Sequence, residues 1–256
     1  MHECKHCHKR IGLRVGTVMH GSKMPFRAWM YAMTMQLLSS RQPSAKSISR
    51  YFGDRYGRKR YQPAWEMLHK LRDAMGKHDA RYKLRQEIEV DEAFFTSYVP
   101  CKDKAGRKLK RGAGSHRKVK VLVMDESLTP DPEKQSINSL KKKHPFNRAL
   151  GYVRMRIVSD LKQGTIYRQL CKYVAMGSTI YTDASKSHAY FSKHFNPVSQ
   201  VVKPEDAGTV LPWLHICISN YKRELDDVHH GMKWDYMQYY LDSCSYRFKG
   251  GDGAMQ

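Results

Sequence analysis

The nine residues EIEVDEAFF, at positions 87–95, constrain this chain more than any other stretch. Their pattern predicts a β-strand, in which Glu89 and Asp91 share one face while Val90 lies on the other. A carboxylate buried without a partner is costly, so a cation should meet this face of the sheet. The residues alone leave two candidates open, an arginine or lysine side chain and a metal ion.

The net charge indicates the class of partner. The 256 residues include 46 Lys and Arg against 24 Asp and Glu, a formal charge of +22, and the 41% hydrophobic content suffices for a folded core. Such a charge attracts polyanions, of which nucleic acid is the commonest. A membrane surface is the alternative, but we find neither a basic amphipathic helix nor a lipidation motif. We therefore expect double-stranded DNA as the partner and no membrane association.

Cysteine usage and the first residues bear on the compartment. The opening MHECKHCHKR lacks the apolar segment of a secretory signal, and the apolar stretch at 26–38 is too short to span a bilayer. Four cysteines stand alone, which indicates reduced thiols rather than a disulfide framework: Cys101, Cys171, Cys217 and Cys244. These features predict a cytoplasmic protein, associated with the nucleoid if it binds DNA.

Residues 23–85 are predicted to form a small helical domain. Helices are expected at 26–38, 43–53 and 61–76. Ser44 is the expected N-cap of the second helix and Gly53 its stop. The last two helices, with basic side chains outward, suggest a helix-turn-helix-type DNA-binding unit, and an ordinary helical hairpin is the alternative.

The hydrophobic pattern changes at residue 86, and 86–248 is predicted to form an α/β domain. Strands are expected at 87–95, 118–124, 150–158, 178–183 and 198–202. Helices are expected at 161–175, 186–195, 210–228 and 233–247. Three strands followed by alternating helices and strands is the order of a ribonuclease-H-like mixed sheet with flanking helices. The last residues, 249–256, are expected to be a disordered tail.

A second acidic residue stands at the end of another expected strand. Asp183 ends STIYTD, and the ribonuclease-H-like order makes its strand the neighbour of the one that carries Asp91. Two carboxylates so close to each other need a cation between them. Mg²⁺ prefers a few carboxylates together with water and phosphate oxygens. A third ligand should come from the helix after Pro212, where Asn220 and Glu224 lie one turn apart beside the apolar stripe.

Four segments, taken in order, resemble the ISXO2-like group of bacterial insertion-sequence transposases: EIEVDEAFF, STIYTDASKSHAYF, LPWLHICISNYKRELDDVHHGM and YMQYYLDSCSYRF. The resemblance covers nearly the whole chain. It implies an enzyme that cleaves DNA at element ends and transfers strands, with an Asp-Asp-Asn or Asp-Asp-Glu active site. It also implies two Mg²⁺ or Mn²⁺ ions held by Asp91, Asp183 and Asn220. Helix geometry leaves Glu224, one turn away on the same face, as the alternative third ligand.

Residues 1–22 are interpreted as a partial zinc ribbon and linker, because ECKHCHKRIGLRVGTVMHGSKMPFRAW is similar to the end of that group's ribbon. The group has two CxxC pairs, whereas this chain has only Cys4 and Cys7. A closed structural zinc site normally needs four ligands, so zinc is not expected to be held here. The single CxxC pair and the ending YRFKGGDGAMQ suggest a truncated copy. A non-catalytic DNA-binding protein derived from a transposase is therefore the alternative function.

Basic side chains in several segments are expected to contact DNA phosphates, with a solvated surface as the alternative role. They are Arg58, Lys59, Arg60, Lys70, Arg72, Lys108, Lys110, Arg111, Lys222 and Arg223. The expected assembly is a homodimer on DNA. A junction-resolving or repair nuclease on the same fold is a further functional alternative.

Overall fold

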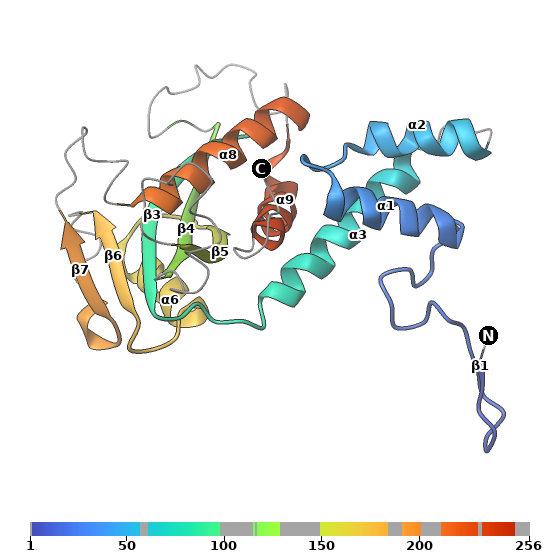
Figure 1. The fold of residues 1–256 in the computed structure, drawn as a ribbon, viewed down its shortest axis with the longest axis horizontal. Helices are drawn as coiled ribbons and strands as arrows, with labels where there is room; N and C mark the ends of the chain where they lie inside the picture. The colour runs from blue at the N-terminus through green and yellow to red at the C-terminus, as the bar shows by residue number, and fades with distance from the viewer. Residues whose placement is uncertain are drawn as a thin grey trace, which may run out of the picture. The chain divides into compact units, whose positions relative to one another are not determined.

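The computed structural model describes residues 2–56, 61–97, 115, 117–128, 149–183, 191–200, 211–229 and 232–248. The chain forms two compact units, Met1–Met75 and Gly76–Gln256, coloured from blue to red along the chain in Figure 1. None of the described helices has the length and apolar character needed to cross a membrane.

The smaller unit contains a short hairpin and three helices. Strands β1 (His2–Glu3) and β2 (Arg10–Ile11) pair antiparallel. The helices are α1 (Phe26–Leu38), α2 (Ala45–Tyr56) and α3 (Tyr61–Asp79). Their core is apolar and fully enclosed, and its largest members are Trp29, Ile48, Phe52, Met67 and Leu68. The three predicted helices are therefore confirmed.

The ends of α2 agree only in part with the prediction. Ser44 Oγ accepts a hydrogen bond from the Ser47 N–H at 3.1 Å, as an N-cap side chain does. Gly53 does not end the helix, which continues to Tyr56. A glycine inside a helix costs only about 1 kcal/mol, and burial of Phe52 beside it offsets that cost.

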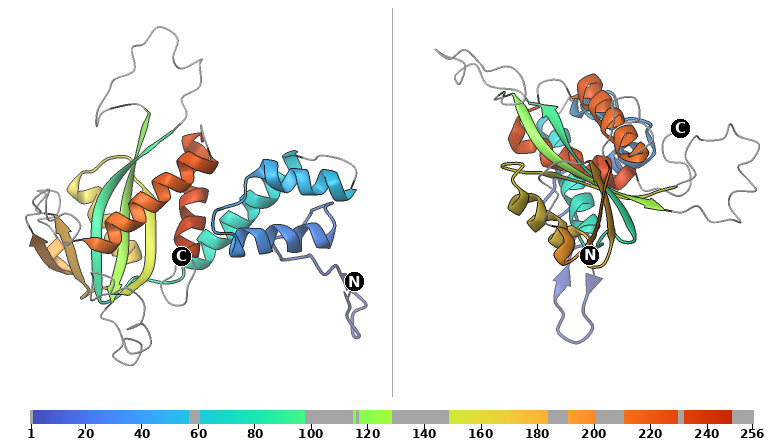
Figure 2. Two further views of the ribbon diagram at one scale, coloured as in Figure 1. Left: turned by 45° about the horizontal axis from the view of Figure 1, so that its top comes forward. Right: turned by 90° about the vertical axis from the view of Figure 1, so that its left-hand side faces the viewer.

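The larger unit is built on a five-stranded mixed sheet. Its strands are β3 (Glu87–Thr96), β4 (Lys118–Leu128), β5 (Ala149–Ile157), β6 (Thr179–Asp183) and β7 (Asn196–Gln200). The spatial order is β5-β4-β3-β6-β7, so β3 is central. It pairs antiparallel with β4 and parallel with β6, and Figure 2 shows the twist of the sheet. The five predicted strands are confirmed to within a few residues.

Helices cover both faces of this sheet (Figures 1 and 2). Helix α6 (Gln163–Tyr173) packs on one face in a core that includes Ile88 and Val90 of β3. Helices α8 (Pro212–Val228) and α9 (Trp234–Arg247) pack on the other face, in a core that includes Ala93 and Phe95. Strand β3 therefore presents its even-numbered residues to α6 and its odd-numbered residues to α8.

One predicted helix is not found in the form expected. Within 186–195 the structure describes only a short 3-10 turn, η3 (Phe191–Lys193), followed by residues that lead into β7. Residues 184–190 lie outside the described part of the chain, as does the predicted tail at 249–256.

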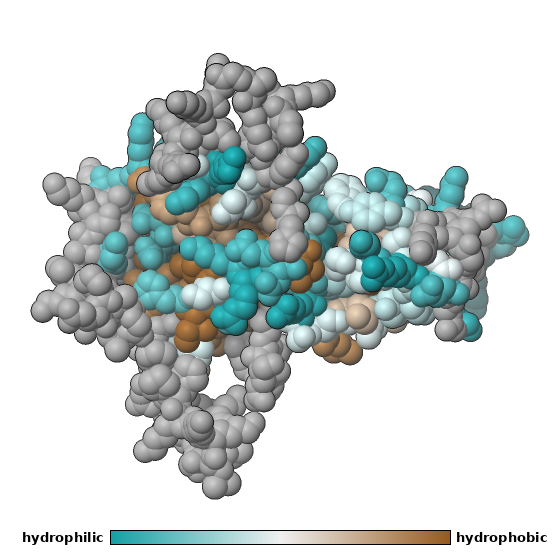
Figure 3. All heavy atoms as spheres, turned by 90° about the horizontal axis from the view of Figure 1, so that it is seen from above, coloured by the Kyte–Doolittle hydropathy of each residue, from teal (hydrophilic) through white to brown (hydrophobic). Residues whose placement is uncertain are grey.

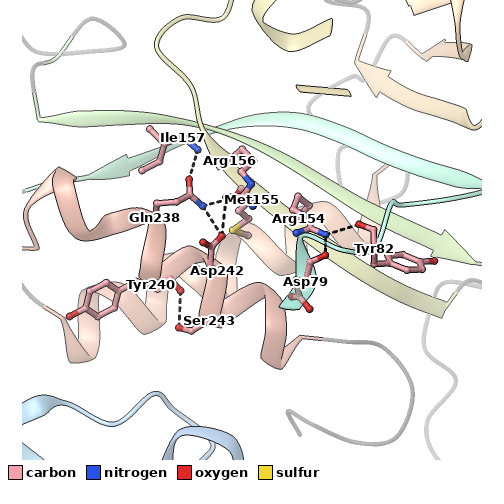
Figure 4. A network of polar contacts seen from close by, with 10 residues as sticks. All are labelled: Asp79, Tyr82, Arg154, Met155, Arg156, Ile157, Gln238, Tyr240, Asp242 and Ser243. Atoms are coloured by element: carbon pink, nitrogen blue, oxygen red, sulfur yellow. Dashed lines mark hydrogen bonds and ion pairs between the residues drawn. The ribbon is translucent and has the colours of Figure 1, made fainter. Parts of the chain in front are cut away.

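Helix α9 covers the outer edge of the sheet at β5. The Gln238 side chain accepts a hydrogen bond from the Ile157 N–H and donates one to the Met155 carbonyl, both at 3.0 Å, as a further strand would. Arg156 also forms an ion pair with Asp242 at 3.3 Å. Figure 4 shows these contacts between β5 and α9. Because an open edge can pair with other chains, this contact also protects the sheet.

Candidate active site

Asp91 and Asp183 lie at neighbouring positions of two paired strands. The parallel register of β3 and β6 pairs Val90 with Thr182, and the next residue of each strand is one of the two aspartates. Paired residues of adjacent parallel strands point to the same face, and the strands are about 4.8 Å apart. The prediction that these strands are neighbours is confirmed, and both aspartates are half-buried.

The face on which Asp91 lies is the one that α8 covers. Asp91 alternates in step with Ala93 and Phe95, which pack in the core formed with α8 and α9. Its Oδ1 accepts a hydrogen bond from the Glu92 N–H at 2.7 Å. Strands β3 and β6 thus bring the two carboxylates to the face covered by α8, the helix from which a third ligand was expected.

A buried acidic pair lies next to this site. Glu89 and Asp125 stand opposite each other on β3 and β4, and both are almost completely enclosed. Burial, and then the facing Glu89, raise the pKa of Asp125 well above its usual range. Glu89 Oε2 accepts a hydrogen bond from the Leu214 N–H, at the start of α8, at 3.2 Å. The sequence predicted an arginine, a lysine or a metal ion as the partner of this face. Glu89 instead binds a backbone N–H in the first turn of a helix.

Glu224 is held by α9. Its Oε1 accepts a hydrogen bond from Arg247 Nη1 at 2.8 Å, and the Cys244 thiol lies 3.5 Å from Oε2. Both carboxylate and guanidinium are buried. Among the described residues, Glu224 does not form a three-ligand group with the two aspartates. Its contact with Arg247 gives this carboxylate a role in packing α8 against α9, and its role as the alternative third ligand stays a prediction.

Asn220 lies one turn before Glu224, on the same side of α8, and is half-buried. The opposite side of the helix is marked by Lys222, whose Nζ lies 6.0 Å from the centre of the Phe95 ring on β3. At about 100° per residue, Asn220 and Lys222 point roughly 200° apart. Asn220 and Lys222 therefore lie on opposite flanks of the apolar stripe of α8, and Asn220 as a metal ligand stays a prediction.

His215 is a residue that the sequence reasoning missed. It lies seven residues before Lys222, so the two share one flank of the apolar stripe of α8, and it directly follows Leu214, whose N–H binds Glu89. Burial lowers the pKa of His215, which favours the neutral imidazole that binds metals. His215 does not, however, form a three-ligand group with Asp91 and Asp183 among the described residues.

The donor set fits a magnesium or manganese ion in part. Two carboxylates on adjacent strands provide the oxygen ligands that Mg²⁺ prefers, and this ion usually retains water and substrate phosphate oxygens as its other ligands. Among the described residues, no three side chains of His, Cys, Asp or Glu form a group that could hold a metal. The two aspartates therefore fit as an open site, which a further ligand and phosphate oxygens would complete.

Cys4 and Cys7 lie in the turn between β1 and β2, and both thiols are exposed. Hydrogen bonds from the Cys7 backbone, then from the His6 backbone, and then from the Cys7 side chain lower the pKa of the Cys4 thiol. Backbone N–H groups that stabilise a thiolate also favour metal binding, because the thiolate is the ligand form. This turn can supply two of the four ligands of a structural zinc site.

The residues predicted to contact DNA fall into three groups. Lys70, Lys222 and Arg223 are exposed. Arg72 is a correction, because it is 1% exposed and donates hydrogen bonds to Gln42 Oε1 and the Pro43 carbonyl, where no phosphate can reach it. The remaining six lie outside the described residues: Arg58, Lys59, Arg60, Lys108, Lys110 and Arg111. Figure 3 views the molecule from the side on which α8 lies in Figure 1 and shows hydrophilic residues interspersed with hydrophobic ones.

The family model of the ISXO2-like transposase domain matches residues 83–249, which include the whole sheet and the helices that carry the candidate site. This chain belongs to that transposase family. The resemblance seen in the sequence is thus confirmed. The match begins just before β3 and includes both aspartates, while the smaller unit lies outside it.

Other comparisons add less. Among solved structures, the chain is similar to one described as "Crystal structure of the Mos1 Strand Transfer Complex", with 12% sequence identity and a TM-score of 0.34. That similarity covers 93% of this chain and 73% of the other. No curated protein matches the chain. The family assignment rests on the match to the family model.

Proposed function

We propose that this ISXO2-like transposase cuts DNA at the ends of an insertion sequence and joins the cut strands to target DNA, with Asp91 and Asp183 as metal ligands. The observation that carries the proposal is their neighbouring register on β3 and β6, on the face that α8 covers. The strand order β5-β4-β3-β6-β7 supports a ribonuclease-H-like assignment of this domain.

The chemistry belongs to phosphoryl transfer. Bound Mg²⁺ or Mn²⁺ ions would activate a water nucleophile and offset the charge that develops on the phosphate. Asp91 and Asp183 would hold the ions, and both side chains are half-buried and so remain partly accessible. Lys222 and Arg223 are exposed on α8 and attract that phosphate before cleavage.

The third ligand comes from α8. The family resemblance favours Asn220, and among the described residues His215 does not form a three-ligand group with Asp91 and Asp183. We expect Asn220→Ala to lose metal-dependent cleavage and His215→Ala to retain most of it. The opposite result, with loss in His215→Ala and activity in Asn220→Ala, would transfer the role to His215.

The smaller unit is proposed to bind the element ends. Its helices α2 and α3 would act as a helix-turn-helix-type unit, and Cys4 with Cys7 would supply half of a zinc ribbon. Lys70, together with the basic residues at 58–60, would contact phosphates. We further propose that the protein acts as a homodimer on DNA in the cytoplasm, at the nucleoid.

The test is nicking of plasmid DNA that carries the sequences flanking the reading frame. The wild-type chain should nick it in Mg²⁺ or Mn²⁺, and Asp91→Asn and Asp183→Asn should bind it equally well without nicking. Asp226→Asn is the matched control, because it removes one exposed carboxylate from α8. Equal nicking by all four proteins would remove the two aspartates from the mechanism.

A non-catalytic DNA-binding protein is the second candidate. The observation that favours it is that the described His, Cys, Asp and Glu side chains do not by themselves form a three-ligand site. Binding to the flanking DNA without nicking at any Mg²⁺ or Mn²⁺ concentration would establish this alternative.

A further inference from the structure

Helix α8 has no cap of its own. Its N-cap residue is Leu211, which has no polar side chain, its first residue is Pro212, and its first turn contains no acidic residue. The first N–H groups of a helix have no partner within the helix and need one elsewhere. Pro212 marks the first helical position, but no local side chain binds the free N–H groups of the first turn.

Glu89 supplies the missing cap from the sheet. Its Oε2 accepts the hydrogen bond of the Leu214 N–H at 3.2 Å, across a sequence separation of 125 residues. Leu214 is the third residue of the helix, which is the position that an N-cap side chain normally binds. The contact is fully enclosed, with Glu89 1% exposed. The start of α8 is thereby attached to a residue two positions before Asp91.

A second contact fixes the direction of the helix along β3. Lys222 Nζ lies over the Phe95 ring, so α8 runs beside β3 from Glu89 toward Phe95. Asp91 lies between these two contacts, about 7 Å along the strand from Glu89. A shift of α8 at its first turn would therefore change the distance from Asp91 to every side chain that the helix offers.

The surroundings of Glu89 make a buried acidic side chain costly at this position. Asp125 stands opposite it, fully buried, and neither of its carboxyl oxygens has a hydrogen-bond partner among the described residues. Burial of two acidic groups side by side is costly, and an apolar pair would fill the same space at lower cost. The hydrogen bond to α8 is the contact that an apolar residue at position 89 could not make.

We propose that Glu89 is a positioning residue, which fixes the first turn of α8 on β3 and so sets the distance between Asp91 and the metal ligand that α8 supplies. This inference rests on the proposed function for its effect on cleavage. The attachment of the helix itself can be measured without any cleavage.

The experiment compares Glu89→Gln, which keeps a side-chain oxygen as acceptor, with Glu89→Leu, which removes it. Asp125→Asn is the matched control, because it alters the facing carboxyl and leaves Glu89 in place. Hydrogen–deuterium exchange of the full-length chain reports on residues 211–218, and peptides from α6 report on the rest of the fold. Plasmid nicking over a Mn²⁺ titration gives the half-saturating metal concentration and the maximal rate.

In Glu89→Leu we expect exchange in 211–218 to become about tenfold faster, as for a lost helix cap, while α6 is unchanged. The half-saturating Mn²⁺ concentration should rise about tenfold, and Glu89→Gln should restore both values to within about threefold. Unchanged exchange in Glu89→Leu would overturn the proposal, as would faster exchange without a change in the metal requirement. Loss of nicking in Glu89→Gln with normal exchange would identify Glu89 as a metal ligand instead. If the wild type does not nick DNA, the proposed function fails while the exchange result still tests the attachment.

Discussion

Glu224 on α8 and Arg247 on α9 form a buried ion pair at 2.8 Å, with side chains 7% and 5% exposed. We predict that Glu224→Ala destabilises the larger unit by about 3–5 kcal/mol, because it leaves the guanidinium buried without its partner. The double variant Glu224→Leu with Arg247→Met should recover most of this loss. Urea unfolding of the three proteins measures the free energies. Normal stability in Glu224→Ala combined with lost nicking would instead support Glu224 as the third metal ligand.

The buried carboxyl of Asp125 predicts a pH dependence of stability. Its pKa is raised, so above about pH 4 the unfolded chain releases a proton that the folded chain retains, and stability falls as pH rises. Asp125→Asn has no such proton. We therefore expect the variant to gain stability relative to wild type between pH 4.5 and pH 8, as followed by urea unfolding at each pH.

Glu89 and Cys217 interact electrostatically with Asp125, so the stability at any one pH contains contributions from all three groups. The slope with pH is therefore the diagnostic quantity, rather than the stability at one pH. A constant difference between Asp125→Asn and wild type over this range would show that Asp125 is ionised in the folded protein.

Two glycines of the larger unit should respond in opposite directions to alanine. A Cβ on Gly151 would lie 2.6 Å from Glu126 Oε2, whereas a Cβ on Gly164 in α6 meets nothing within 4 Å. Glu126 cannot easily move, because it binds the Tyr82 hydroxyl at 2.8 Å and the Tyr152 N–H at 2.9 Å. We expect Gly151→Ala to cost about 1–3 kcal/mol and Gly164→Ala to add about 0.4–1 kcal/mol. Thermal unfolding of both variants checks this, and a neutral Gly151→Ala would show that Glu126 can shift.

Lys70 and Arg72 should separate DNA binding from folding. Both lie on α3, but Lys70 is exposed, while Arg72 is buried against Gln42 and Pro43. We predict that Lys70→Met weakens DNA binding and reduces the salt dependence by about one ion, since it removes one phosphate contact. Arg72→Met should instead lower stability by about 1–3 kcal/mol, because buried acceptors lose their donor.

Fluorescence anisotropy with flanking DNA at several salt concentrations measures the first effect, and urea unfolding measures the second. A drop in affinity for folded Arg72→Met, with its stability unchanged, would place Arg72 at the DNA surface after all.

The sequence predicted the sheet well because its strands are short apolar runs between clear breaks. Asp91 and Asp183 could be placed next to each other from strand order alone, and the register of β3 and β6 agrees with that order. The side from which α8 would offer a ligand could not be derived in this way. Helical periodicity defines an apolar stripe but does not say which flank of the stripe faces β3 and which faces α9.

The partners of buried polar side chains could not be predicted from the sequence either. Arg72 has the local pattern of a solvated arginine on a basic helix, and its partners Gln42 and Pro43 lie about 30 residues earlier. Glu89 binds an amide that is 125 residues away. Periodicity describes neighbours within one element, so partners contributed by distant segments remain hidden until the fold is known.

The central position of β3 has a consequence for biosynthesis. The hairpin with β4 can form early, but β6 and α8 reach β3 only after β5 and α6 have also been made. Segments that are far apart in sequence close slowly and late. A nascent chain emerging from the ribosome would therefore hold Asp91 without Asp183 and without α8. The two aspartates and the helix packed beside them therefore come together only after β6 and then α8 have been synthesised.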